Sequence, residues 1–239
     1  IEWMVTKRHP FSFLTEVSID LSDDEKLMQL MVKAGFYSVF LGIETPNEES
    51  LAECSKFQNK NRDLVACVNK IQKFGLKVMG GFIIGFDNDP PSIFEKQIEF
   101  IQKSGIITAM VGLLNAPRGT RLYQRLLREN RLLKEASGDN TDFSINFIPK
   151  MNYEMLINGY KRIISGIYSP KPFYERVRRF LKEYKSLHKS HFHFSYIHSY
   201  FSYLGAFLKS KWFLGIRDKA RAYNWKFFFW SLFKRPRFF

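Results

Sequence analysis

The chain has 239 residues, 45% hydrophobic and 25% charged, a composition that excludes a disordered or fibrous protein. Its formal net charge is +14, and its two cysteines, Cys54 and Cys67, exclude a disulfide scaffold and a four-thiolate metal site. Charged residues interrupt the first ten positions, so no signal peptide is predicted there and a cytoplasmic location is expected.

The first half of the chain alternates short apolar segments with amphipathic ones. We predict strands at 11–19, 39–43, 77–86 and 106–114, and helices at 23–34, 48–55, 62–74 and 93–104. In the first helix, Leu27, Leu30 and Met31 are expected to face inward. Strands that alternate with helices at this spacing form parallel units, so the expected fold is α/β. Part of an α/β barrel is the first interpretation and a doubly wound open sheet the second.

Ligands of parallel sheets bind at the carboxyl ends of the strands. Six residues are predicted to lie there: Asp20, Glu44, Gly85, Asp87, Asp89 and Asn115. Each residue type also occurs in turns or at helix ends, and that structural role is the alternative for every one of them. Glu44 stands out because glutamate is a poor helix cap beside Thr45 and Asn47, so we expect it to face a ligand.

Glycines interrupt the predicted strand at 77–86. Gly80 and Gly81 weaken a strand unless another group must approach its backbone closely. A planar adenine or a ribose lying against the sheet would be such a group, and tight helix packing is the alternative. The segment lacks the Gly-Lys-Ser/Thr of a phosphate loop.

Three segments, 41–45, 80–87 and 114–120, resemble in order and spacing the later strands of the radical S-adenosylmethionine enzymes. In particular, the chain resembles the subgroup that carries a cobalamin-binding domain and a C-terminal domain of unknown function, to which hopanoid methylases belong. Later segments are similar to that C-terminal region, namely 146–149, 159–160, 167–170, 174–176 and 223–225.

The resemblance implies the second half of a partial (βα)6 barrel followed by a mostly helical C-terminal region. The expected division is a partial barrel at 1–122, a connecting segment at 123–170 and a basic, aromatic helical region at 171–239. In such enzymes S-adenosylmethionine lies across the strand ends. The positions that match its contacts are Glu44 for the ribose or methionine part, Lys56 for the carboxylate, Gly81, Ile83 and Gly85 for the adenine motif, and Asn115 for the adenine. The alternative for Lys56 is a solvated surface lysine.

Two departures from the family pattern limit this inference. The last acidic position of the adenine motif falls on Asn88, so that either Asp87 or Asp89 substitutes for it or the contact is absent. The Cys-x-x-x-Cys-x-x-Cys motif of the 4Fe-4S cluster is absent, and Cys54 and Cys67 are expected to be inert thiols. We therefore expect cluster and cobalamin to be bound only by residues outside this chain, which would be part of a longer enzyme. No catalytic residue and no metal ligand is assigned here.

The positive charge is concentrated in residues 171–239, which hold 16 Lys and Arg against three Asp and Glu, and 22 of the 40 aromatic residues. Helices are predicted at 174–187 and 194–208, and the most aromatic stretch is 223–233. The histidines at 188, 191, 193 and 198 match no standard ligand spacing, so no metal site is predicted from them.

A solvated basic face over an aromatic core, a membrane-surface segment and a nucleic-acid site are the three interpretations of this region. The block 225–230 contains more adjacent rings than single-stranded nucleic acid needs, so nucleic acid is disfavoured. Burial in a core and peripheral membrane contact through 209–239 both stay open.

Two functions follow from these observations. The first is the C-terminal part of a cobalamin-linked radical S-adenosylmethionine enzyme, a methyltransferase acting on a small or lipid-like substrate. The alternative is a non-catalytic binding or membrane-surface module built on a half-barrel.

Overall fold

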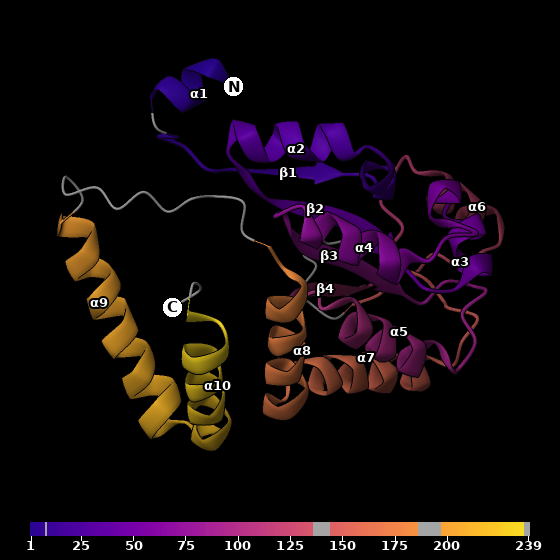
Figure 1. Ribbon diagram of the computed structural model, residues 1–239. Helices are drawn as coiled ribbons and strands as arrows, with labels where there is room; N and C mark the ends of the chain where they lie inside the picture. Colours follow the sequence, from indigo (N-terminus) through magenta and orange to yellow (C-terminus); the bar gives the residue numbers. More distant parts are fainter. Residues whose placement is uncertain (8, 136–143, 186–196, 237–239) are drawn as a thin grey trace.

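The computed structural model describes residues 1–7, 9–135, 144–185 and 197–236, with side chains from residue 204 onward in the last range. Its centre is a sheet of four parallel strands in the order β1-β2-β3-β4 (Figure 1). The strands are β1 (Phe13–Val17), β2 (Phe36–Glu44), β3 (Lys77–Ile84) and β4 (Thr108–Leu113). The expected α/β fold with a parallel sheet is confirmed.

Helices connect successive strands. They are α2 (Glu25–Ala34), α3 (Glu48–Glu53), α4 (Leu64–Lys73) and α5 (Ile93–Ser104), with the short 3-10 turns η1 (Ile19–Asp23) and η2 (Phe57–Asn59). Of these, α2 and α4 pack against one face of the sheet (Figure 1). The helix α1 (Glu2–Thr6) precedes β1. Asp24 and Asp63 accept hydrogen bonds from backbone amides at the starts of α2 and α4. Gly35 and Gly105 adopt positive φ angles directly after α2 and α5, as expected of glycines that end helices.

The buried face of α2 differs from the prediction. Met28, Met31 and Val32 are buried, whereas Leu27 and Leu30 are 44% and 40% exposed. Both sets of residues recur at helical spacing, and the expected inward position of Leu27 and Leu30 was wrong. The choice between two apolar stripes is made by packing against the sheet, which the sequence of the helix alone does not contain.

The two faces of the sheet have different surroundings. Val39, Leu41 and Ile43 of β2, together with their neighbours Val78 and Phe82 of β3, belong to the buried core that also includes helix residues. The opposite face carries Phe40, Gly42, Met79, Gly81, Ile83 and Met110 at alternating positions, of which Met110 is 52% exposed. This second face is the open face of the sheet.

Three helices follow the sheet: α6 (Arg121–Arg128) lies beside α3 at the strand ends, whereas α7 (Tyr153–Tyr168) and α8 (Pro170–Glu183) cover the β4 edge (Figure 1). The hydroxyl of Tyr168 donates to the carbonyl of Ala109 at 2.8 Å and accepts from its amide at 3.1 Å, which satisfies exposed backbone groups of β4. Arg176, only 1% exposed, donates to the carbonyl oxygens of Ile107 and Ile167. The helix α8 begins four residues before the predicted start at 174, because Pro170 occupies its first turn after Ser169.

The last described elements are α9 (Ile197–Trp212), the π-helical turn η4 (Phe213–Arg217) and α10 (Arg221–Lys234). They form a hairpin that stands beside the rest of the molecule and contacts α8 through α10 (Figure 1). Among the described residues, no helix combines the length and the apolar character needed to cross a membrane.

Candidate ligand-binding site at the strand ends

The end of β2 has an unusual backbone. Glu44 adopts a φ angle of 65°, in the left-handed region that residues other than glycine rarely occupy, and the pairing register with β3 shifts between Gly42 and Glu44. The amide of Thr45 then donates to the carbonyl of Ile43 at 2.9 Å. Such local strain persists only where surrounding contacts enforce it, and it is concentrated at functional sites.

The Glu44 side chain forms an ion pair with Lys56. Its Oε1 lies 3.0 Å from the Lys56 Nζ, and the two side chains are 16% and 32% exposed. A Cβ atom at Gly42 would lie 2.5 Å from the Glu44 Oε1 and 2.8 Å from the Lys56 Nζ. The absence of a side chain at Gly42 therefore leaves the space that the pair occupies.

Asn59 holds the backbone of this bulge, although the sequence did not identify it as a site residue. Its side chain is 1% exposed, and its Nδ2 donates to the carbonyls of Gly42 and Ile43, at 3.1 Å each. An asparagine in a short polar loop carries no sequence signal for this role. Its position became evident only from the fold.

A cleft of about 410 Å³ opens beside the pair, at the carboxyl ends of β1 and β2. It is lined by Glu16, Val17, Ser18, Ile19, Phe40, Gly42, Glu44, Lys56, Gln58 and Asn59. A carboxylate and an ammonium group next to each other can contact a ligand that carries both charges. The predicted residues Glu44 and Lys56, far apart in the expected strand pattern, are thus brought together.

Both glycines of β3 lie close to neighbouring side chains, on opposite faces of the sheet. A Cβ at Gly80 would meet the Phe82 and Ile106 side chains at 2.7 and 3.1 Å, so tight packing accounts for this glycine. Gly81 lies on the open face, where a Cβ would come within 2.9 Å of the Phe40 ring. Ile83 shares that face but, like Gly81, does not line the cleft.

The loop after β3 is held by hydrogen bonds within the protein. Gly85 has a φ angle of 103° and is buried against Leu156. Asp89 accepts hydrogen bonds from the amides of Gly85 and Phe86 and from the hydroxyl of Ser50, at 2.9, 3.1 and 2.6 Å. Burial raises the pKa of the Asp89 carboxyl despite these hydrogen bonds. Asp89 therefore has a structural role in shaping this turn.

Asp87 lies in a cluster of charges away from the cleft. Its carboxylate, 3% exposed, is 2.6 Å from Arg131 and 3.1 Å from Arg125, and Lys150 is 3.8 Å away. Burial disfavours its ionisation, but the hydrogen bonds and charge of Arg131 and the charge of Arg125 lower the pKa of Asp87 overall. Arg125 also pairs with Glu53 of α3 at 2.8 Å. No sequence pattern indicates this cluster, because each basic member is at least 38 positions from the carboxylate that it pairs with.

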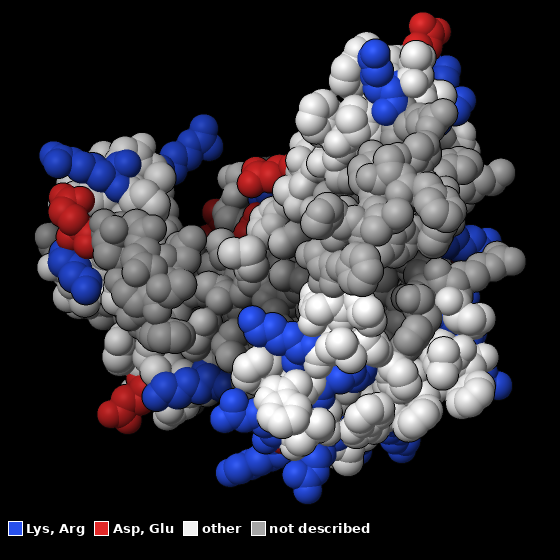
Figure 2. Space-filling view, turned by 90° about the vertical axis from the view of Figure 1, so that its left-hand side faces the viewer, with Lys and Arg blue, Asp and Glu red and all other residues white. Residues whose placement is uncertain are grey.

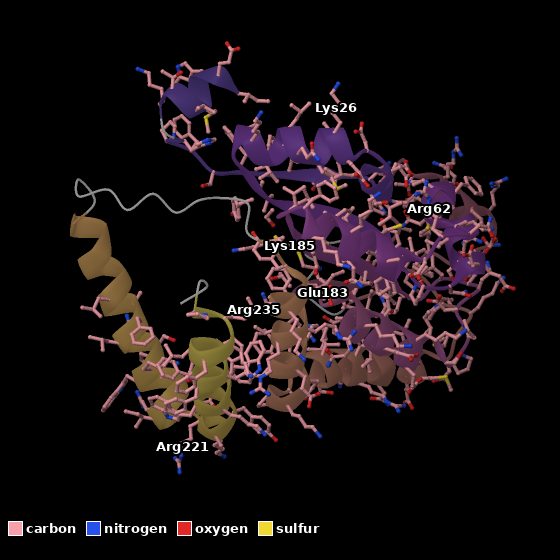
Figure 3. The ribbon with its side chains drawn as sticks, in the orientation of Figure 1. Lys26, Arg62, Glu183, Lys185, Arg221 and Arg235 are labelled. Carbon is pink, nitrogen blue, oxygen red and sulfur yellow. The ribbon has the colours of Figure 1, made fainter. Side chains whose placement is uncertain are left out.

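The remaining strand-end residues also lie outside the cleft. Asn115 donates through Nδ2 to the carbonyls of Leu113 and Ser144, at 3.3 and 3.2 Å. Asp20 lies in η1 and pairs at 3.2 Å with Arg62, whose position Figure 3 marks. A second cavity of about 330 Å³ opens near the ends of β3 and β4, lined by Glu53, Cys54, Phe86, Leu114, Arg121, Leu122 and Arg125. Glu44, Gly85 and Asn115 lie at the carboxyl ends of β2, β3 and β4 but do not share a single cavity.

The cysteines are separate from one another and partly covered. Cys54 follows α3 and Cys67 lies in α4, and burial raises the pKa of the Cys54 thiol. Within the described part of the chain, no three His, Cys, Asp or Glu side chains converge as metal ligands would. The histidines at 188, 191 and 193 lie outside the described residues, as does the side chain of His198.

The helical part of the chain matches a known protein family. A family model described as a domain of unknown function, DUF4070, matches residues 120–239, which begin at the N-cap of α6. The chain belongs to the DUF4070 family. The DUF4070 segment therefore comprises α6 to α10. Its Arg125, Arg131 and Tyr168 contact the sheet unit, by which we mean β1 to β4 with α2 to α5.

The DUF4070 chain is also similar to proteins named as methyltransferases. An uncharacterized methyltransferase of Synechocystis is 44% identical over 75% of this chain and 34% of its own length. The hopanoid C-2 methylase of Rhodopseudomonas palustris is 28% identical over 74% of this chain and 32% of its own. The bacteriochlorophyllide d C-12(1)-methyltransferase of Chlorobaculum tepidum is 22% identical over 68% and 35%. The chain thus spans about a third of the length of these curated relatives.

Proposed function

We propose that this chain is the C-terminal part of a radical S-adenosylmethionine methyltransferase that acts on a lipid-like substrate. In this proposal, β1 to β4 are the later strands of a partial six-stranded barrel, and the strand ends contribute to the S-adenosylmethionine site. The resemblance of the strand-end motifs and the names of the relatives support it. The name of the hopanoid methylase supports the substrate class.

The observation that carries the proposal is the Glu44–Lys56 pair in the cleft. S-adenosylmethionine ends in an amino acid, whose ammonium group would be bound by the Glu44 carboxylate and whose carboxylate would be bound by Lys56. Gly42 leaves room at this point, and Asn59 fixes the backbone that carries Glu44. When bound, S-adenosylmethionine supplies the transferable methyl group or the radical precursor, and these residues would hold its methionine end.

The other family cofactors do not fit the residues of this chain. A three-thiolate cluster needs three convergent cysteines, whereas the chain has two, of which Cys54 has a raised pKa. We propose that the cluster and cobalamin are bound by parts of the longer enzyme outside this chain. The contribution of this chain would then be cofactor positioning and substrate access rather than the redox step.

Equilibrium dialysis of the purified chain against radiolabelled S-adenosylmethionine tests the site. We expect weak, saturable binding that falls by about tenfold in E44Q and in K56Q, because each variant loses a charge-assisted hydrogen bond. E25Q is the matched control. Glu25 on α2 pairs with Lys70 on α4 at 2.9 Å, and neither residue lines the cleft. Binding that is absent, or unchanged in E44Q and K56Q, would instead favour the non-catalytic module.

A second experiment addresses the reaction in the longer protein to which we assign the chain. After anaerobic purification, it is supplied with methyl-labelled S-adenosylmethionine and a lipid extract of its host. Label should enter the lipid fraction with the wild-type protein and the E25Q control, and less label should enter with E44Q. Label recovered only in the aqueous phase would argue against a lipid-like substrate while leaving the cofactor site intact.

A further inference from the structure

The hairpin of α9, η4 and α10 presents apolar side chains to solvent. Phe233, Leu208 and Trp212 are 76%, 58% and 54% exposed, and Ile216 and Phe229 are each at least half exposed. These residues come from all three elements of the hairpin. Isolated exposed apolar residues are common on proteins, but a set of this density marks an interaction surface.

The exposed surface lies opposite the side of α10 that docks on α8. Asn224 donates to the Tyr174 hydroxyl at 3.0 Å, the Phe227 and Tyr174 rings are 5.5 Å apart, and Arg235 donates to the carbonyl of Lys182. Phe229 and Phe233, one helical turn apart, are exposed on the side away from these contacts. The body of the molecule therefore anchors the hairpin but leaves its outer side uncovered within the described residues.

The same surface is strongly basic. Residues 204–236 contain eight Lys and Arg and one acidic residue, Asp218. Figure 2 shows Lys and Arg side chains gathered around uncharged surface at the lower part of this face, where Figure 1 places the joined ends of α9 and α10. The Nζ of Lys211 lies 4.2 Å from the centre of the Phe228 ring, so cations and rings are interleaved.

We propose that this hairpin, residues 204–236, docks the chain onto an anionic lipid surface. Its Lys and Arg side chains would contact headgroup phosphates, and its exposed Leu, Ile, Trp and Phe side chains would enter the boundary between headgroups and acyl chains. The exposed Leu and Ile side chains distinguish this surface from a nucleic-acid site, because aliphatic groups do not stack on bases. The proposal does not depend on methyltransferase activity.

Flotation of the purified chain with vesicles tests the proposal. We expect binding to mixed phosphatidylglycerol and phosphatidylcholine vesicles, weak binding to pure phosphatidylcholine, and only a partial loss of binding at high salt. The double variant R221E/K226E reverses two exposed charges and should weaken binding by at least about tenfold. The double variant L208S/F233S removes two exposed apolar side chains and should weaken it by at least about tenfold as well.

Matched controls separate this surface from general effects. K26E reverses an exposed charge on α2, at the opposite end of the molecule from Arg221 (Figure 3), and L133S removes an apolar side chain that is 61% exposed elsewhere. Both should bind as the wild type does. Circular dichroism verifies that all four variants fold, and brominated phospholipids should quench the tryptophan fluorescence of the wild type.

Several outcomes would overturn the proposal. One is absence of binding to anionic vesicles, and another is equal loss of binding in the controls. A third is that the wild type does not bind vesicles but self-associates in sedimentation equilibrium, and that L208S/F233S abolishes this self-association. That result would assign the surface to a second copy of the chain. Tighter binding to single-stranded DNA than to the vesicles would assign it to nucleic acid.

Discussion

Glu44 combines an unfavourable backbone conformation with a side chain that points at a cation. A residue with a Cβ in the left-handed region costs about 1 kcal/mol or more, and a partly exposed ion pair such as Glu44–Lys56 contributes less than about 1 kcal/mol. The pair alone therefore does not offset the strain. A glycine would serve the fold better at this position, and the presence of glutamate is consistent with a role in ligand binding.

Replacing Glu44 in two ways separates strain from charge. E44A loses the ion pair and keeps a Cβ at a φ angle of 65°, whereas E44G loses the pair and relieves the backbone. We expect the free energy of unfolding of E44G to exceed that of E44A by about 1 kcal/mol, measured by urea denaturation. Equal stabilities would mean that the bulge relaxes when the carboxylate is removed, and the strain argument would then fail.

Two glycine-to-alanine substitutions should differ in how much stability they cost and in whether they weaken cofactor binding. At Gly42 the new methyl group would meet only the mobile ends of Glu44 and Lys56, so the fold should lose less than about 1 kcal/mol while the pair is displaced and cofactor binding weakens. At Gly159 in α7 the methyl group would overlap the buried Phe94 ring, and a loss of about 1 to 3 kcal/mol is expected. Urea denaturation and dialysis on both variants check this, and a large loss of stability in G42A would show that the pair cannot move aside.

At the scale of elements, the sequence predicted the sheet unit well. Apolar runs bounded by turn residues located all four strands, and glycines located the ends of α2, α4 and α5, because these signals are local. It failed where a contact partner decides the outcome. The inward face of α2, the burial of Arg176 in α8 and the role of Asn59 each depend on a neighbour that is distant in sequence.

The charge cluster around Asp87 joins elements from both parts of the chain. Glu53 of α3 and Asp87 of the β3–α5 loop belong to the sheet unit, whereas Arg125 of α6 and Arg131 belong to the DUF4070 segment. Asp87 is the one member of this cluster that was predicted to bind the cofactor, and it does not line the cleft beside Glu44. The geometry supports a structural role for Asp87 in attaching α6 to the strand ends.

This attachment should depend on pH. Because the folded protein lowers the pKa of Asp87, its ionised form stabilises the fold above the unfolded pKa of about 3.9, and that contribution is lost as the pH falls through the folded pKa. D87N should therefore cost about 2 kcal/mol at neutral pH and progressively less below about pH 4, measured by urea denaturation. D63N is the control, since asparagine caps α4 as well as aspartate does. A cost of D87N that stays constant with pH would rule out the ionised pair as its source.

At the scale of the whole molecule, the β4 edge strand is covered by helices, whereas the β1 edge strand is not covered within the described residues. The β4 edge is covered, since Tyr168 bonds to the backbone of Ala109 and Arg176 bonds to Ile107. β1 is the opposite edge strand, and its neighbourhood exposes Leu14 and Phe11 at 49% and 58%. If β1 pairs with earlier strands in a longer enzyme, as the barrel proposal requires, this edge would be covered there.

An uncovered strand with apolar side chains is a template for pairing between molecules. The isolated chain should therefore self-associate at rising concentration, and L14K should reduce this, because a charge on an edge strand opposes pairing. The Leu14 side chain is about half exposed, so the free energy of unfolding should change by less than about 0.5 kcal/mol. The matched control is L133K, which introduces the same charge at an exposed leucine outside the sheet.

Sedimentation velocity over a concentration series measures the self-association of the wild type and of both variants. A similar reduction in L14K and L133K would attribute the association to net charge rather than to β1, and an unchanged association in both would place the contact elsewhere on the molecule.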